Sequence, residues 1–354
     1  MKIYTKIKFF FKVLGDVFWN IVSLKSLYYI VENANWSIKH DGINITANLK
    51  AYPSRLAITH YGIRNAIIHF GSIHTFWSNS GPCAPHKSNK IVVSWFHVVP
   101  GDRRLHFLSD MKDKVDMWHT SSSITQKKLI AEGIPRDKIK IIPLGVDLKV
   151  FRNAGRAERK DILRIIGIPE DVIVIGSFQK DGIGWKRGLL PKMIKGPDIF
   201  CDSVEKIAKK KRIVVLLTGP AREYVKMRLE QAGILYKHFF LTTHDEIAHY
   251  YRALDLYIVA SREEGGPKAV LESLASGVPV VSTRVGMVPD IVQDGFNGLI
   301  ANKEDSEQIA NLSLRILDDI KLRDRLICNG LETVRSFAWN LIADEYCRRI
   351  YEKV

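Results

Sequence analysis

Two carboxylates lie eight positions apart on either side of a glycine-proline turn. Between Ser261 and Glu272 the chain reads Ser-Arg-Glu-Glu-Gly-Gly-Pro-Lys-Ala-Val-Leu-Glu, which places acids at Glu264 and Glu272. Pro267 suits the first position of a helix, where the amide that proline lacks has no partner. The free amides at that helix start, with the positive end of the helix dipole, favour an anion. The segment therefore predicts a site for a diphosphate.

The same turn offers two ways to hold a sugar. Gly265 and Gly266 let the backbone approach a ligand closely because they carry no side chain. Glu264, on the turn, can accept hydrogen bonds from sugar hydroxyls, and Glu272, inside the helix, can accept them from two vicinal ribose hydroxyls. The alternative, that both glutamates are solvated surface residues, is less favoured because strand, turn and helix occur together.

The elements that must position this turn follow from apolar runs along the chain. Short apolar strands alternate with helices, which is typical of doubly wound parallel sheets. Two such runs flank Arg152–Glu158, which lacks apolar periodicity and predicts a linker, whereas Trp36–Gly42 is ambiguous between a hairpin turn and a loop entering a strand. The predicted strands are Ala66–Phe70, Ile91–Val98, Met117–Ser121, Ile139–Pro143, Val172–Phe178, Ile213–Thr218, Phe239–Thr242, Leu256–Ala260 and Val278–Ser282; the predicted helices are Ser123–Glu132, Pro197–Lys210, Arg222–Ala232, Asp245–Ala253 and Pro267–Ser276.

We therefore expect an α/β protein with two doubly wound domains that face one cleft. In open α/β sheets the ligand binds beyond the carboxyl ends of the strands, so the cleft is the expected active site. Arg222 follows a predicted strand end, where it either meets a phosphate or lies on the surface at a helix start.

The segment from Ser261 onward resembles the E-x7-E signature of glycosyltransferase family 4, whose members are retaining enzymes with the GT-B fold. Further resemblance lies at Lys138–Phe151, Val280–Asp290 and Asp294–Ile300, and Ser336–Trp339 resembles the start of the last helix, which in this fold crosses back to the N-terminal domain. Roughly the first 60 residues match poorly. The resemblance implies an acceptor-side domain at 1–152, a nucleotide-sugar domain at 153–335 and a returning helix at 336–354.

The resemblance also implies roles for single residues. Glu264 would contact the donor sugar and Glu272 the ribose, while Lys195 would bind the donor phosphates. The family arginine that follows the preceding strand is replaced here by Gly-Ser-Phe-Gln-Lys, ending at Lys180, so we expect Lys180 to bind phosphate, with Lys186 or Arg187 as further candidates. His97 matches the family histidine that faces the donor sugar, and Arg222 is the remaining candidate for the donor site.

Metal use is expected to be absent. No Asp-x-Asp motif occurs in the sequence, and the nearest cluster, Asp110, Asp113 and Asp116, has the spacing of a solvated helix face. We therefore predict a metal-independent enzyme without a cofactor, in which basic side chains and a helix dipole replace the metal.

The charge of the chain predicts an anionic partner. The formal net charge is +15, an excess that favours nucleic acid, phosphate-bearing substrates or anionic lipid. The run Lys206–Arg212 predicts a solvated helix face, and the basic blocks lack the interleaved aromatics of nucleic-acid-binding modules. Four scattered cysteines without a Cys-x-x-Cys pair favour reduced thiols in the cytoplasm.

The N-terminal segment is apolar but interrupted by a polar stripe at Lys8, Lys12, Asp16, Asn20 and Ser23. Two interpretations of residues 1–24 stay open. In one, the helix lies in a membrane interface with its lysines toward anionic headgroups. In the other, it is buried against the N-terminal domain.

Together these observations predict a retaining glycosyltransferase on the cytoplasmic face of a membrane. It would move a hexose-type sugar from a nucleotide diphosphate sugar to a glycan or lipid-linked acceptor in surface polysaccharide synthesis. One alternative is a non-hydrolysing nucleotide-sugar epimerase on the same fold. The other is a basic nucleic-acid-binding protein, although no nucleic acid partner is expected.

Overall fold

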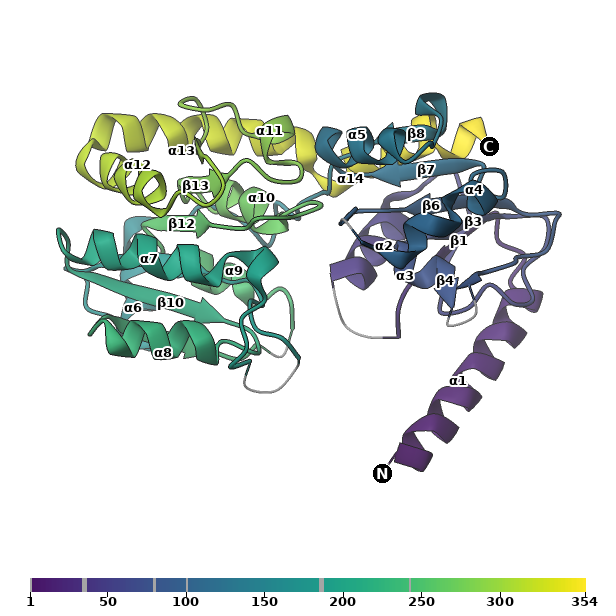
Figure 1. The fold of residues 1–354 in the computed structure, drawn as a ribbon, viewed down its shortest axis with the longest axis horizontal. Helices are drawn as coiled ribbons and strands as arrows, with labels where there is room; N and C mark the ends of the chain where they lie inside the picture. The colour runs from purple at the N-terminus through teal and green to yellow at the C-terminus, as the bar shows by residue number, and fades with distance from the viewer. Residues whose placement is uncertain (1, 34–36, 79–80, 100, 185–187, 242) are drawn as a thin grey trace. The chain divides into compact units, whose positions relative to one another are not determined.

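The computed structural model describes residues 2–33, 37–78, 81–99, 101–184, 188–241 and 243–354 (Figure 1). It divides into two compact units. Unit 1 comprises Met1–Gly145 together with Trp339–Val354, and unit 2 comprises Val146–Ala338. The chain therefore enters unit 2 once and returns to unit 1 for its last helix. Lys186 and Arg187, two of the predicted phosphate ligands, lie outside the described residues.

Unit 1 is built on a six-stranded parallel sheet with the strand order β2-β1-β3-β6-β7-β8. Strands β1, β3 and β7 are buried along their whole length, as expected of a parallel sheet covered on both faces. Its strands are β1 (Leu27–Ile30), β2 (Ser54–Ala57), β3 (Ile67–Phe70), β6 (Lys90–Ser94), β7 (Met117–Thr120) and β8 (Ile139–Ile141), with a short pair β4 (Trp77–Ser78) and β5 (Gly81–Pro82); its helices are α1 (Lys2–Val22), α2 (Ser37–Asn48), α3 (Ile73–Phe76), η1 (Arg103–Phe107), α4 (Leu108–Met111), α5 (Ser123–Ala131), η2 (Arg136–Lys138), α14 (Trp339–Arg349) and η5 (Tyr351–Lys353).

Unit 2 is built on a second six-stranded parallel sheet with the order β11-β10-β9-β12-β13-β14. Numbered within the unit, this is the order 3-2-1-4-5-6 of dinucleotide-binding folds. Its strands are β9 (Ile173–Ser177), β10 (Ile213–Thr218), β11 (Leu235–Phe239), β12 (Leu256–Val259), β13 (Val280–Thr283) and β14 (Leu299–Ala301); its helices are α6 (Arg156–Ile166), η3 (Met193–Lys195), α7 (Pro197–Ala208), α8 (Glu223–Gln231), α9 (Ile247–Tyr251), α10 (Lys268–Ala275), α11 (Val288–Ile291), α12 (Ser306–Asp318), α13 (Ile320–Val334) and η4 (Arg335–Phe337).

Three local predictions were wrong in whole or in part. The ambiguous Trp36–Gly42 segment, described from residue 37 on, is the start of α2 rather than a turn. Gly42 lies there because α2 packs tightly on the sheet: an added Cβ would lie 2.8 Å from side-chain atoms of Leu56 and Tyr29. The predicted linker Arg152–Glu158 is irregular up to Gly155, as expected, and then enters α6. The buried apolar positions of α6, Ile162, Leu163 and Ile166, come later in the sequence.

The third error concerns the strand predicted at Phe239–Thr242. The strand β11 ends where that prediction begins, at Phe239. It lies at the edge of the sheet beside β10, and its residues are only half-buried or exposed. An edge strand that is only partly buried lacks the continuous apolar run of a central strand. The strand was therefore predicted a few residues too late in the sequence.

The last helix, α14, belongs to unit 1, as the fold prediction requires. The indole of Trp339 packs against Gly145, in the segment that follows β8. A Cβ on Gly145 would lie 2.5 Å from the indole ring. Further along, Tyr346 and Tyr351 reach a buried polar row on the sheet. His69 Nδ1 lies 2.7 Å from the Tyr351 hydroxyl, and His119 Nε2 lies 3.0 Å from the Tyr346 hydroxyl. The returning helix is thus fixed by hydrogen bonds as well as by apolar contact.

Helix α1 is attached to unit 1 by its polar side. Asp16 accepts hydrogen bonds from Arg55 Nη2 at 2.7 Å and from the Ile58 amide at 2.7 Å. Asn20 donates to the carbonyl oxygens of Thr59 and Tyr61, at 3.0 and 2.9 Å. The rest of the helix extends away from the sheet of unit 1 (Figure 1). Within the described chain no helix is both long enough and apolar enough to cross a bilayer.

Candidate active site

The candidate site lies in unit 2 at the carboxyl ends of β9 and β12. The strand order of this sheet reverses between these two neighbours, and in open α/β sheets such a switch point is where ligands bind. The loop leaving β9 contains Lys180, and the loop leaving β12 contains Glu264. The topology thus brings two of the predicted donor-binding residues to the same edge of one sheet.

Glu264 and Lys195 form an ion pair at this edge. Lys195 Nζ lies 2.6 Å from Glu264 Oε1, and the Ser261 hydroxyl donates to the same oxygen at 2.9 Å. Only 7% of the Glu264 side chain and 18% of the Lys195 side chain are exposed. A carboxylate this deeply buried needs a cationic partner, and Lys195 compensates the charge of Glu264. The sequence predicted both residues separately, but it did not predict their direct contact.

The loops that carry this pair are joined through their backbones. The carbonyl oxygen of Ile194 accepts hydrogen bonds from the amides of Arg262 and Glu263, at 2.9 and 3.0 Å. Gly196 has φ +60°, and a Cβ at this position would lie 1.9 Å from the carbonyl oxygen of Ala260. Because no side chain fits there, only glycine allows the start of α7 to approach the end of β12. This contact fixes Lys195 beside Glu264.

Arg262 reinforces the same junction from outside. Its guanidinium makes two hydrogen bonds of 2.7 Å to the carboxylate oxygens of Asp198, near the start of α7, and it also binds Glu304. Such a bidentate arginine-carboxylate pair has a defined geometry. Arg262 was predicted only as part of the signature segment, because its partners are too distant in the chain for spacing to reveal them.

Three lysines gather around Glu264. Besides Lys195, they are Lys180 in the loop after β9 and Lys192 in the same loop before η3. Burial lowers the pKa of Lys180. Burial, followed by the positive charges of Lys195 and Lys180, lowers the pKa of Lys192, which the charge of Glu264 partly offsets. Sequence reasoning missed Lys192 because it lies inside the insertion between β9 and α7, for which the resemblance supplied no template.

Arg222 has a different place from the one its position in the sequence predicted. Its guanidinium is fully buried and donates to the Ser177 carbonyl oxygen at 2.9 Å. It also donates to the carbonyl oxygen of Gln179 and lies 3.1 Å from Asp181 Oδ2. The alternative of a surface residue is therefore wrong, because Arg222 is buried, and contact with a donor phosphate stays a prediction. Arg222 holds the loop that carries Lys180.

Glu272 lies inside α10 and contacts residues before and within α9. The Tyr251 hydroxyl donates to Glu272 Oε2 at 3.0 Å, and His244 Nε2 lies 3.4 Å from Glu272 Oε1. Burial raises the pKa of Glu272, but the hydrogen bond and charge of His244 and the charge of Lys268 outweigh it, so the pKa lies below its ordinary value. The carboxylate is therefore held ionised and ready to accept hydrogen bonds.

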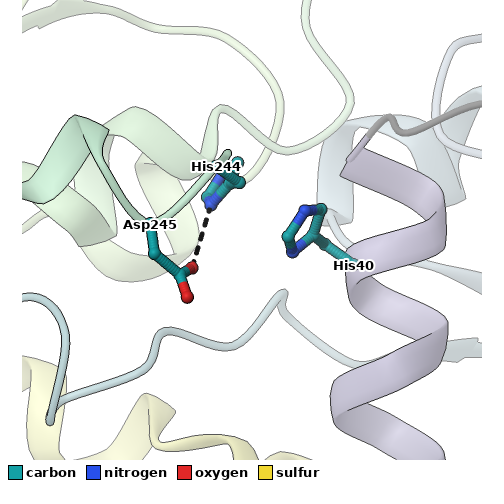
Figure 2. Close-up of side chains that lie close together, drawn as sticks. All are labelled: His40, His244 and Asp245. Carbon is teal, nitrogen blue, oxygen red and sulfur yellow. Dashed lines mark ion pairs between the residues drawn. The ribbon is translucent and has the colours of Figure 1, made fainter. Parts of the chain in front are cut away.

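His244 was not predicted as a site residue. Figure 2 shows its ring beside Asp245, and His244 Nδ1 lies 3.9 Å from Asp245 Oδ1. The imidazole thus stands between two carboxylates, those of Asp245 and Glu272. A histidine after a half-buried edge strand carries no motif, so no signal in the sequence could have linked it to a glutamate many residues later.

The turn before α10 contains Gly265, Gly266 and Pro267. Gly265 is buried, and Gly286, with φ +50°, packs so closely that a Cβ there would lie 2.5 Å from the carbonyl oxygen of Gly265. Gly266 is half-buried and leads into Pro267. Helix α10 begins at Lys268, so Pro267 precedes the helix rather than occupying its first turn.

His97 belongs to unit 1. It follows β6 by three residues, at the carboxyl edge of that sheet, and its side chain is exposed. The indole of Trp95 donates to its carbonyl oxygen at 2.8 Å, which fixes the backbone of the loop. A contact between His97 and the donor sugar stays a prediction.

Comparison with known proteins bears first on unit 2. Residues 186–333, which include the whole segment around Glu264, match the family model of Glycosyl transferases group 1. Over 239 residues the chain is 26% identical to D-inositol 3-phosphate glycosyltransferase of Thermobifida fusca, covering 60% of this chain and 49% of that protein. Over 155 residues it is 32% identical to the lipopolysaccharide core biosynthesis mannosyltransferase LpsB of Rhizobium meliloti, covering 41% of this chain and 44% of that protein. The chain spans about half the length of these curated relatives.

A solved structure resembles the chain along nearly all of its length. The structure of Alr3699/HepE from Anabaena, in complex with UDP-glucose, aligns with a TM-score of 0.75 and 14% identity, covering 93% of this chain and 100% of that one. The fold is GT-B. The prediction of two doubly wound α/β domains with a returning last helix is therefore confirmed.

Proposed function

We propose that this chain transfers a sugar from a nucleotide diphosphate sugar to an acceptor hydroxyl. The observation that carries the proposal is the buried pair of Lys195 and Glu264, 2.6 Å apart at the switch point of unit 2, with Lys180 and Lys192 close by. A leaving diphosphate gains negative charge as its bond to the sugar breaks, and fixed positive groups stabilise that charge. The match of residues 186–333 to a glycosyltransferase family supports the same activity.

The transfer proposed here retains the configuration at the anomeric carbon. The acceptor oxygen forms a bond to that carbon on the face from which the diphosphate leaves, and the bond to the diphosphate oxygen breaks. The departing phosphate oxygen takes the proton of the acceptor, so no side-chain base is required. Glu264 then orients the sugar through hydrogen bonds, and Glu272, steadied by Tyr251, accepts them from the ribose. The resemblance to family 4 supports this course.

The proposed acceptor is a glycan or a lipid-linked glycan intermediate of surface polysaccharide synthesis, met at the cytoplasmic face of a membrane. One relative is a lipopolysaccharide core biosynthesis mannosyltransferase, which supports a surface glycan. The resembling HepE structure holds UDP-glucose, which makes a UDP-hexose the first donor to test. Four cysteines without disulfides fit a reducing compartment.

We also propose that the reaction needs no divalent metal and no cofactor. Lys180, Lys192 and Lys195 would neutralise the leaving diphosphate, and the start of α10 would add the positive end of its dipole. Activity should survive treatment with EDTA. Loss of activity on EDTA treatment, with recovery when Mg²⁺ or Mn²⁺ is added back, would contradict metal independence without touching the transferase assignment.

The transferase assignment is tested by following the donor with and without an acceptor. A glycosyltransferase releases nucleotide diphosphate rapidly only when an acceptor is present, and it forms a new glycosidic bond. An epimerase converts the donor without any acceptor. A basic nucleic-acid-binding protein would bind DNA with a steep dependence on salt and would show no affinity for any nucleotide sugar.

A further inference from the structure

Helix α1 attaches to unit 1 with its polar side and leaves its apolar side uncovered. The hydrogen bonds of Asp16 and Asn20 to the segment from Arg55 to Tyr61 fix which side faces the protein. Gly62 confirms the closeness of the contact, because a Cβ there would lie 3.0 Å from the carbonyl oxygen of Val17. Asp16 and Asn20, two members of the predicted polar stripe, therefore bind the protein and do not point toward lipid headgroups.

The opposite side of α1 carries a continuous row of large apolar residues, which we call the apolar stripe. Its members recur at the spacing of one helical face and are each about half exposed or more, from 49% for Ile7 and Leu14 to 65% for Phe11. Soluble proteins rarely expose contiguous apolar patches of this kind unless the patch contacts a partner. The stripe consists of Ile7, Phe10, Phe11, Leu14 and Phe18. Ile21, one helical turn further on, contacts the protein at Gly62 instead.

The charges around the stripe favour an anionic partner. The sequence places Lys2, Lys6, Lys8 and Lys12 before its first acid, Asp16, and Arg55 already neutralises that acid at 2.7 Å. Three members of the stripe, Phe10, Phe11 and Phe18, are aromatic, and such residues on the apolar face are typical of helices that lie at the boundary between headgroups and acyl chains. An exposed apolar face and an excess of positive charge in the same segment are the two features that hold a helix in the plane of an anionic bilayer.

We propose that the apolar stripe of α1 inserts into the surface of an anionic bilayer and binds the enzyme peripherally. The helix lies in the interface with Asp16 and Asn20 directed toward unit 1, so the protein itself covers the polar side. Of the two interpretations that the sequence left open for residues 1–24, the proposal takes the membrane interface, with the protein in contact with Asp16 and Asn20. The proposal rests on the proposed function in one respect: binding to the bilayer would bring the enzyme to a lipid-linked acceptor.

The experiment measures co-sedimentation of the full chain with vesicles of phosphatidylcholine alone or mixed with phosphatidylglycerol. We expect strong binding to the mixed vesicles and weaker binding to the neutral ones, because the lysines contribute only where the lipid is anionic. The double substitution Phe11→Ser and Phe18→Ser should reduce binding to mixed vesicles roughly tenfold or more, since bound apolar area sets the affinity. The matched control is Leu235→Ser with Phe240→Ser, which removes equally exposed apolar residues from unit 2 (69% and 73%).

Three outcomes would overturn the proposal. The first is a wild type that does not bind the mixed vesicles, and the second is binding by both double variants equal to that of the wild type. The third is a wild-type dimer in sedimentation equilibrium that Phe11→Ser with Phe18→Ser dissociates, which would assign the stripe to a second copy of the chain. Donor binding is measured on the same samples. Intact donor binding without vesicle binding contradicts only the membrane proposal, whereas loss of donor binding in the wild type contradicts the proposed function.

Discussion

Glu264 and Lys195 form an ion pair in the structure, which contains no donor. Because the ammonium group of Lys195 lies 2.6 Å from Glu264, a diphosphate bound as proposed would share this lysine with the carboxylate. Removing the carboxylate therefore has two separable effects. The sugar loses a hydrogen-bond acceptor, while the lysine becomes more available to phosphate.

The first prediction is that Glu264→Gln strongly lowers the rate of sugar transfer but does not weaken binding of the free nucleotide diphosphate. Transfer should fall by roughly a hundredfold, the size of effect seen when a group that positions the reacting centre is lost. Titration calorimetry should show binding of UDP or GDP that is unchanged or tighter. A variant with full transfer activity, or one that no longer binds the nucleotide, would contradict this role of Glu264.

A second prediction concerns Lys192, which the sequence did not single out. Lys192→Met should raise the Kd for the nucleotide sugar by roughly tenfold, which corresponds to about 1.4 kcal/mol, because one of three cations beside the diphosphate is lost. The matched control is Lys206→Met, on the far part of α7, where a half-exposed lysine pairs with Glu307. Equal donor affinity in the two variants would remove Lys192 from the site.

At the scale of elements, the loop after β9 depends on one buried arginine. Arg222 and Asp181 are fully buried and 3.1 Å apart, and burial raises the pKa of Asp181 in spite of that arginine. Removing one member of such a pair leaves the other charge uncompensated. The loop with Lys180 and Lys192 would then lose its support.

The third prediction is therefore that Arg222→Met lowers the free energy of unfolding by about 3–5 kcal/mol and weakens donor binding as well. The double variant Arg222→Met with Asp181→Leu should recover part of the stability, since it removes both charges. Urea denaturation of the two variants tests this. A single variant as stable as the wild type would show that the pair does not hold the loop.

Tyr346 of α14 and Tyr351 of η5 contact the buried histidines His119 and His69. We therefore expect unit 1 to be less stable in acid. Burial lowers the pKa of His69 and lowers that of His119 to about 4. Both imidazoles must therefore stay neutral in the folded state. Because the unfolded chain binds more protons, their contribution is complete above the unfolded pKa near 6.5 and is lost progressively as the pH falls below it toward about 4.

The fourth prediction follows from that sign. The free energy of unfolding of unit 1 should decrease between about pH 6.5 and pH 4, and His119→Asn should make this decrease shallower. His86→Asn, at an exposed loop position, serves as the control and should leave the slope as it is. Denaturant titrations along a pH series, followed by tryptophan fluorescence, give the slope directly. An equal slope in all three proteins would contradict the role assigned to His119.

At the scale of the whole molecule, the sequence predicted most of the architecture and part of the site. The central strands were found because β10, for example, is a continuous apolar run, and the turn before α10 was found because its residues are adjacent in the chain. Lys192, His244 and the partners of Arg222 were missed or misplaced because their contacts join distant segments. Likewise, the polar stripe of α1 was visible in the sequence, but only the fold shows that Asp16 binds Arg55.

The central claim is that unit 2 binds a nucleotide diphosphate sugar through the Lys195–Glu264 pair. Calorimetric titration of UDP-, GDP- and ADP-sugars into the wild type and into Lys195→Ala tests it most directly. We predict that one of these donors binds the wild type and that Lys195→Ala weakens its binding by roughly tenfold or more. Failure of every donor to bind the wild type, or equal affinity in the variant, would contradict the claim.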